Sequence, residues 1–174
     1  MMVLRALLFI TLATGLVVVG VPAQIVAAAG AADPMSLGAG RWAGVLLAAA
    51  GFLAYLACVY DFLTAGRGTP APYDPPRRLV ARRLYRHVRN PMYLSLLSAL
   101  LGEAIYFQSA RLIAYAAVVA LAVHLFVVLY EEPTLTRRFG AGYEAYRQRV
   151  PRWIPRWTPA EDPAGAANRS SQGG

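Results

Sequence analysis

The chain has 174 residues, of which 57% are hydrophobic and only 15% are charged, and its mean hydropathy is +0.43. This excess of apolar residues exceeds what one small soluble core can bury, so it argues against a soluble single-domain enzyme and favours a membrane protein. The single cysteine, Cys58, cannot form an internal disulfide. The sequence has only two histidines, His87 and His124, so we expect no zinc or other metal site.

The basic residues indicate which partners to expect. All 17 are arginines, and the formal net charge is +8. Basic clusters often bind nucleic acid, but this one directly precedes an apolar segment, where membrane topology and anionic lipid headgroups explain it. We therefore expect membrane lipids as partners and no nucleic acid. The cluster consists of Arg77, Arg78, Arg82, Arg83, Arg86 and Arg89.

Four apolar segments follow one another along the chain. They run from about Leu4 to Ala29, Trp42 to Leu63, Met92 to Ser109 and Leu112 to Tyr130. A helix of roughly 20 apolar residues spans a bilayer, so the sequence predicts an all-α, polytopic integral membrane protein with about four transmembrane helices. A cleavable signal peptide, with Val21 and Ala23 before the cut, is the alternative for the first segment, although its apolar run is longer than usual.

The distribution of arginines along the chain predicts its orientation in the membrane. The loop from Arg67 to Arg89 and the region from Arg137 to Arg156 are Arg-rich, and the positive-inside rule places both in the cytoplasm, together with the N-terminus. We expect a bacterial cytoplasmic membrane. The chain divides into two N-terminal helices (1–64), a cofactor-binding region (65–157) and a disordered tail rich in Pro, Ala, Gly and Ser (158–174).

The third and fourth segments predict a helical hairpin. Only Gln108 to Arg111 separate them, which requires neighbouring antiparallel helices. Tyr93 lies about 17 residues from the turn and Glu131 about 20, so at 1.5 Å per residue both travel roughly 25 to 30 Å. Asn90, Tyr93, Glu131 and Glu132 are therefore expected to meet at one cytoplasmic rim.

Two features of this rim suggest its chemistry. Asn90 before Pro91 is expected to be the N-cap of the third helix. Glu131 and Glu132 are expected to end the fourth helix, with Pro133 starting another, and an acidic pair at a helix C-terminus needs a cationic partner. That partner is either a nearby arginine or a positively charged ligand; both alternatives remain open here.

Beyond Pro133, an apolar face predicts a cytoplasmic amphipathic helix. It consists of Leu135, Phe139, Tyr143, Tyr146 and Val150. Two ionisable residues, Glu103 and His124, stand within the membrane segments, and each has either a packing role or a role in a substrate cavity.

An ordered set of residues covers about residues 77 to 156. It consists of Leu79, Val80, Tyr85, Arg89, Asn90, Pro91, Met92 and Tyr93, then a hydrophobic hairpin, then Glu131, Glu132, Phe139, Gly140, Tyr143, Tyr146, Val150 and Pro151. This set resembles the isoprenylcysteine carboxyl methyltransferase family and the related phospholipid methyltransferases.

The resemblance implies an integral membrane methyltransferase that uses S-adenosylmethionine to methylate a lipophilic small molecule or lipid from the bilayer. It assigns no catalytic residue to this chain. The cofactor-binding residues it implies are Arg77, Arg78, Leu79, Val80, Tyr85, Asn90, Pro91, Met92, Tyr93, Glu131 and Glu132. The ammonium group of the cofactor suits the paired carboxylates.

Three positions depart from the family pattern. Many relatives have His where this chain has Asn90, and Gly where it has Arg83. Prenylcysteine enzymes carry an Arg at the position of Val127, so this chain lacks the charged partner of a prenylcysteine carboxylate. A non-catalytic transport or scaffold protein, motivated by Glu103 and His124, and a reductase on a similar scaffold are the alternatives. The acceptor atom and the oligomeric state stay open.

Overall fold

The structure is a computed structural model that describes residues 12–29, 38–66 and 81–160. All regular elements in these ranges are helices, as the composition predicts. A π-helical turn, Leu16–Gly20, leads into α2 (Val21–Ala29), and a short 3-10 turn, Gly38–Arg41, leads into α3 (Trp42–Asp61), which ends in the π-helical turn Phe62–Gly66. A 3-10 turn, Arg83–Arg86, precedes α4 (Pro91–Phe107).

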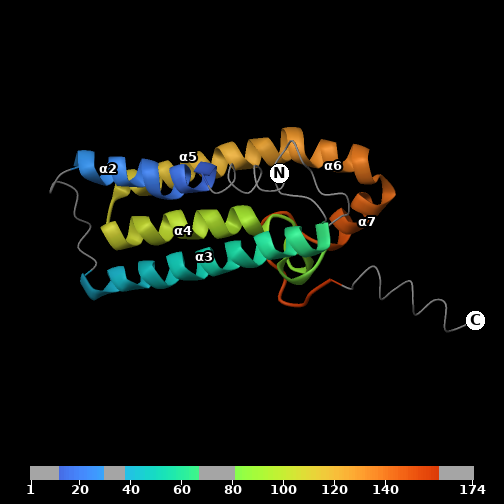
Figure 1. Cartoon of the computed structure of the whole chain (residues 1–174), viewed down its shortest axis with the longest axis horizontal. Coiled ribbons are helices and arrows are strands. Elements are labelled where there is room, and N and C mark those ends of the chain that lie inside the picture. Colours follow the sequence, from blue (N-terminus) through green and yellow to red (C-terminus); the bar gives the residue numbers. More distant parts are fainter. Residues whose placement is uncertain (1–11, 30–37, 67–80, 161–174) are drawn as a thin grey trace, which may run out of the picture.

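The second half of the fold consists of one long continuous helix followed by a short helix that folds back. Helix α5 (Ala110–Phe126), a π-helical turn (Val127–Glu131) and α6 (Glu132–Phe139) follow one another without a gap, and α7 (Ala141–Arg149) turns back. Figure 1 shows α2, α3, α4 and α5 side by side along the long axis, with α6 and α7 at one end. Residues 150–160, which we call the strap, continue from α7 without regular structure.

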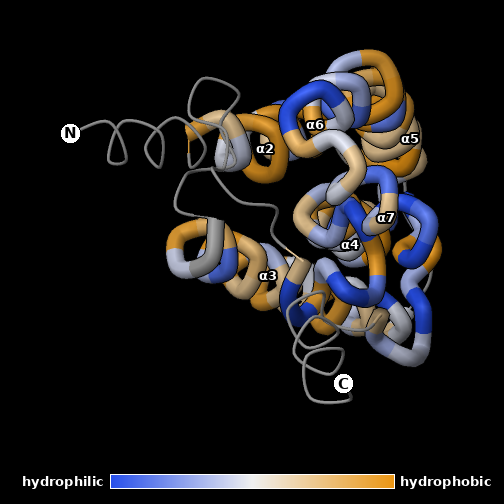
Figure 2. Tube along the Cα trace, turned by 90° about the vertical axis from the view of Figure 1, so that its right-hand side faces the viewer, coloured by the Kyte–Doolittle hydropathy of each residue, from blue (hydrophilic) through white to orange (hydrophobic). Residues whose placement is uncertain are grey.

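Two helices, Gly38–Thr64 and Ala110–Phe139, are long and apolar enough to cross a membrane, and Leu12–Ala28 and Pro91–Phe107 are shorter apolar helices. Their outer faces carry large exposed apolar side chains, such as Leu46 and Phe52 on α3 and Val118 and Leu121 on α5. Figure 2 shows the bundle end-on, with hydrophobic residues along much of α3, α4 and α5. So much apolar surface is unfavourable in contact with water but favourable in contact with lipid chains. The fold is therefore that of a membrane protein.

Small residues bring α3 and α4 into close contact. Gly44 and Gly51 on α3 are buried and lie seven residues apart, facing Gly102 and Ser95 on α4. A Cβ atom added at Gly51 would lie 2.6 Å from the backbone oxygen of Ser95. Membrane helices that approach this closely gain van der Waals contact along their backbones, which stabilises the α3–α4 pair.

The predicted hairpin is confirmed, with a tighter turn than expected. Only Gln108 and Ser109 lie between α4 and α5. Gln108 adopts a left-handed conformation (φ 54°), and the Ser109 side chain accepts a hydrogen bond from the amide of Leu112. Because the turn is so short, α4 and α5 return to the same end of the bundle.

The expected end of the fourth helix at Glu131 and Glu132 is wrong. The backbone stays helical from Ala110 to Phe139. Pro133 stands in the first turn of α6, and the preceding turn is π-helical, with the amide of Glu132 bonded to the oxygen of Val127. This wider turn lets the helix pass a proline that has no amide hydrogen. The acidic pair therefore lies inside a continuous helix, where no helix C-terminus opposes it.

The expected single amphipathic helix after Pro133 is also wrong. Gly140 interrupts it with φ 50° and ψ −129°, a conformation that favours glycine, and α7 starts at Ala141. The expected apolar face nevertheless packs as one cluster, because the break folds α7 back. The buried members are Tyr143, Tyr146, Val150 and Ala160, with Leu135, Phe139 and Ala81 packed against them.

Candidate functional site

The predicted rim is present where α4 begins and the long helix passes it. The hydroxyl of Tyr93, in the first turn of α4, donates a hydrogen bond to Glu131 Oε2 at 3.0 Å. Glu131 ends the π-helical turn, an element that is frequent at functional sites because it changes the direction of side chains in a helix. The sequence prediction that Tyr93 and Glu131 meet is therefore confirmed.

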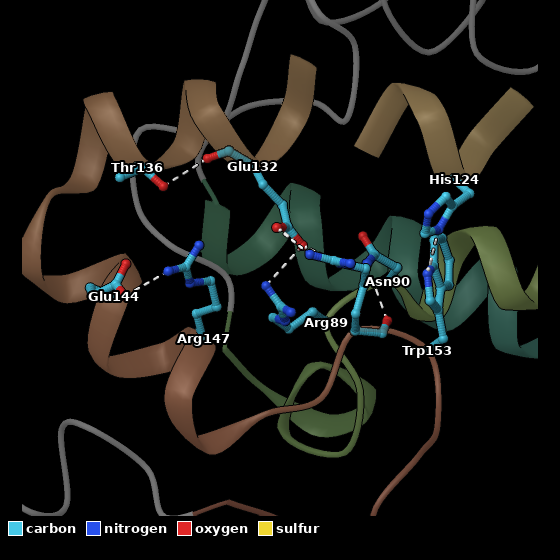
Figure 3. A network of polar contacts seen from close by, with 9 residues as sticks. Arg89, Asn90, His124, Glu132, Thr136, Glu144, Arg147 and Trp153 are labelled. Atoms are coloured by element: carbon cyan, nitrogen blue, oxygen red, sulfur yellow. Dashed lines mark hydrogen bonds and ion pairs between the residues drawn. The ribbon is translucent and has the colours of Figure 1, made fainter. Parts of the chain in front are cut away.

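Glu132 is held by two arginines. Arg89 Nη1 lies 2.9 Å from Glu132 Oε1, and Arg152 donates from Nε to Oε1 at 2.7 Å and from Nη2 to Oε2 at 2.8 Å. Figure 3 shows Glu132 reaching from α6 toward Arg89. The hydrogen bond to Glu132 raises the pKa of Arg152 above its ordinary value, so its guanidinium stays charged. For Glu132, the cationic partners are therefore these two arginines.

Glu131 is in a different situation from its neighbour. Among the described residues it has no cationic partner; its hydrogen bond comes from the neutral hydroxyl of Tyr93. A carboxylate at the end of membrane helices with no opposite charge is costly unless a ligand supplies that charge. The two adjacent carboxylates thus differ: Glu132 joins α6 to Arg89 and the strap, whereas Glu131 has no described cationic partner.

The strap completes the rim. The amide of Arg89 donates to the oxygen of Pro151 at 2.9 Å, and Asn90 Nδ2 donates to the oxygen of Arg152 at 3.2 Å. Asn90 occupies the predicted N-cap position and Pro91 the first turn, but the Asn90 side chain makes no capping bond. It instead binds the strap, which brings Arg152 to Glu132.

His124 and Trp153 form a second contact between the strap and the long helix. Trp153 Nε1 donates to His124 Nδ1 at 3.1 Å, and the two rings lie 6.0 Å apart (Figure 3). Sequence reasoning did not anticipate the contacts of Arg152 and Trp153. Their partners lie 20 and 29 positions away in the sequence, so no local pattern predicts these contacts.

Tyr85 lies in the 3-10 turn before α4 and is buried. Its ring packs against Phe62 at 5.6 Å, with Cys58 and Met92 in the same cluster, and its backbone oxygen accepts a hydrogen bond from the Tyr146 hydroxyl at 2.7 Å. Burial raises the pKa of Tyr85 well above its ordinary value, so its phenol stays neutral. Tyr85 connects α3 with α7 through these contacts.

The remaining expected residues are placed as follows. Arg77, Arg78, Leu79 and Val80 lie outside the described residues. Glu103 lies in α4, far from the rim along the helix, and its Oε2 is buried without a described hydrogen-bond partner. The structure thus brings together Asn90, Tyr93, Glu131 and Glu132, and does not bring Glu103 to them.

The comparisons with known proteins agree with this arrangement. The model of the phospholipid methyltransferase family matches residues 39–142, which include α3, α4, the long helix and the acidic pair. No curated protein and no solved structure matches the chain. The match covers more than half of the 174 residues. The chain belongs to the phospholipid methyltransferase family, a family of membrane methyltransferases.

Proposed function

We propose that this protein is an S-adenosylmethionine-dependent methyltransferase that acts on a lipophilic small molecule or lipid taken from the bilayer. The observation that carries the proposal is Glu131, a carboxylate that the Tyr93 hydroxyl orients and that no described cation neutralises. Membership of a methyltransferase family supports a methyl donor, and S-adenosylmethionine is the cofactor that such families generally use.

The chemistry of the rim fits this cofactor. S-adenosylmethionine carries an ammonium and a sulfonium, and when bound it supplies a methyl group that is already activated for transfer. Glu131 would bind the ammonium, and Tyr93 would hold the carboxylate in place. Glu132, with both oxygens bound by arginines, would keep Arg89 and the strap in position around the site. The protein's contribution is mainly orientation and the exclusion of water.

The same proposal includes four membrane spans, with the rim in the cytoplasm. Arg41 and Arg111 stand at the opposite ends of α3 and α5 from the rim. The other described arginines surround the rim, as the positive-inside rule requires of a cytoplasmic side. They are Arg82, Arg83, Arg86, Arg89, Arg137, Arg138, Arg147, Arg149, Arg152 and Arg156. A soluble cofactor then enters from the cytoplasm and an acceptor from the lipid.

Val127 restricts the choice of methyl acceptor. It occupies the position of the arginine in prenylcysteine enzymes. It is the first residue of the π-helical turn, and only 1% of its surface is exposed. A buried apolar side chain cannot bind a carboxylate, so we propose an acceptor other than prenylcysteine.

The test is transfer of a labelled methyl group. Membranes that contain the protein are incubated with methyl-labelled S-adenosylmethionine, and the organic extract is counted and identified. The proposal expects a labelled lipophilic product that disappears in Glu131→Gln and persists in Glu144→Gln, an exposed carboxylate paired with Arg147. Binding of the cofactor without any labelled product would favour the non-catalytic alternative.

A further inference from the structure

The strap presents two large apolar side chains that the fold leaves outside. Trp157 is 99% exposed and Ile154 is 80% exposed, although the strap is held firmly elsewhere. We infer that the strap lies in the headgroup layer of an anionic bilayer and that Ile154 and Trp157 insert into it. The inference concerns the lipid partner of the strap and does not depend on methyl transfer.

The position of the strap along the long helix supports this depth. Trp153 is hydrogen-bonded to His124, which lies seven residues before Glu131 and therefore about 10 Å from it along the helix, toward the middle of the bundle. The neighbours of His124 on the exposed surface, Leu121 and Leu125, belong to the apolar face of a helix long enough to cross a membrane. Through Trp153, the strap reaches the level at which the helix meets lipid.

The strap cannot easily turn its apolar side chains inward. The amide of Arg156 is bonded to the oxygen of His87 at 3.0 Å, and that of Ala160 to the oxygen of Arg86 at 2.9 Å. The Pro151 oxygen accepts from Arg89, so both ends of the strap are attached to the segment before α4. Ile154 and Trp157 therefore face outward as a fixed feature, and tryptophan is the residue that favours a membrane interface.

The charge around the strap selects the lipid. Several exposed arginines at this end of the molecule have no carboxylate within ion-pair distance among residues 12–29, 38–66 and 81–160; Arg147 has one, in Glu144. Anionic headgroups would provide negative charge for these arginines beside the apolar side chains of the strap. A neutral lipid surface would not provide that charge. These arginines are Arg82, Arg137, Arg138, Arg149 and Arg156.

Spin labels on the full chain test the inference. Cys58 is the one cysteine of the sequence and is buried, so Cys58→Ala provides a background for single Ile154→Cys and Trp157→Cys variants. Each variant keeps the other apolar side chain. The label's collisions with oxygen, which concentrates in lipid, and with a water-soluble nickel chelate are measured in vesicles of phosphatidylcholine with and without phosphatidylglycerol.

Two positions calibrate the measurement. Val118→Cys, on the outer face of α5 and 65% exposed, gives the value for lipid, and Gln148→Cys, exposed on α7, gives the value for water. We expect both strap labels to favour oxygen over the chelate severalfold relative to Gln148→Cys, and to move deeper when phosphatidylglycerol is added. Values equal to those of Gln148→Cys would overturn the inference, as would shielding from both reagents, which would indicate a covering protein. Equal depth in the two lipids would overturn its anionic part.

Discussion

The hydroxyl of Tyr93 and the carboxylate of Glu131 lie 3.0 Å apart, although 38 positions separate them in the sequence. The contact exists because a turn of two residues returns α5 to the end of the bundle where α4 begins. It orients a carboxylate that has no described cationic partner, whereas the adjacent Glu132 is bound by Arg89 and Arg152. The difference between these two neighbours leads to separate predictions for each.

Tyr93→Phe should weaken the binding of S-adenosylmethionine and leave the fold intact. The substitution removes one hydrogen bond to Glu131 and keeps the ring, so we expect a loss of about 1 kcal/mol in binding, roughly fivefold in affinity. Equilibrium binding to the purified protein measures it. Unchanged affinity would mean that the hydrogen bond from Tyr93 to Glu131 has no part in the proposed binding.

Glu132→Gln should instead reduce stability. Glu132 is buried, and its loss leaves the half-buried Arg89 without its carboxylate, so we expect a cost of about 3 kcal/mol in the free energy of unfolding. Denaturant unfolding in detergent, followed by circular dichroism, checks this value. The matched control is Glu144→Gln on the exposed surface, where a change of less than about 1 kcal/mol is expected. Equal effects of the two substitutions would contradict the assignment.

Gly51→Ala should disrupt the contact between α3 and α4. The added Cβ meets backbone atoms at 2.6 Å and 2.9 Å, which cannot move without separating the helices, so we expect a cost of about 2 kcal/mol or more. Gly142→Ala in α7 is the control, because nothing lies within 4 Å of its Cβ and alanine favours the helix. Thermal unfolding of both variants should move in opposite directions; a stabilised Gly51→Ala would refute the close packing.

Arg83 offers a test of backbone strain. Its φ is +44°, a left-handed value that glycine adopts without cost. Arg83 also lies 3.6 Å from Asp61, so its replacement removes an ion pair. Arg83→Gly and Arg83→Ala both lose the pair, but only glycine relieves the strain. We expect Arg83→Gly to be more stable than Arg83→Ala by about 1 kcal/mol in denaturant unfolding, and the reverse order would show that the residue is unstrained.

Much of the fold follows from the sequence because hydrophobic segments and a short turn leave few arrangements. The length of the apolar runs predicts the helices, and the turn at Gln108 requires that Tyr93 and Glu131 meet. The close contact of α3 and α4 also has a signal in the sequence. Gly44, Gly51 and Cys58 recur every seven residues, which is the spacing of one helix face.

Other parts of the site could not be predicted from local patterns. The π-helical turn before Pro133 has no reliable sequence signature, and it makes the helix continuous where a proline predicts an end. Arg152 reaches Glu132 from an irregular segment, and such a contact depends on where the chain folds back after Gly140. Tertiary packing determines this contact, and no periodic pattern in the sequence predicts it.

Calorimetric titration of the detergent-purified protein with S-adenosylmethionine tests the central claim most directly. We predict saturable binding that Glu131→Gln weakens about tenfold or more, because a charge-assisted hydrogen bond is lost, while Glu144→Gln binds as the native protein does. A flat trace for the native protein, or equal affinities of the native protein and Glu131→Gln, would contradict the account.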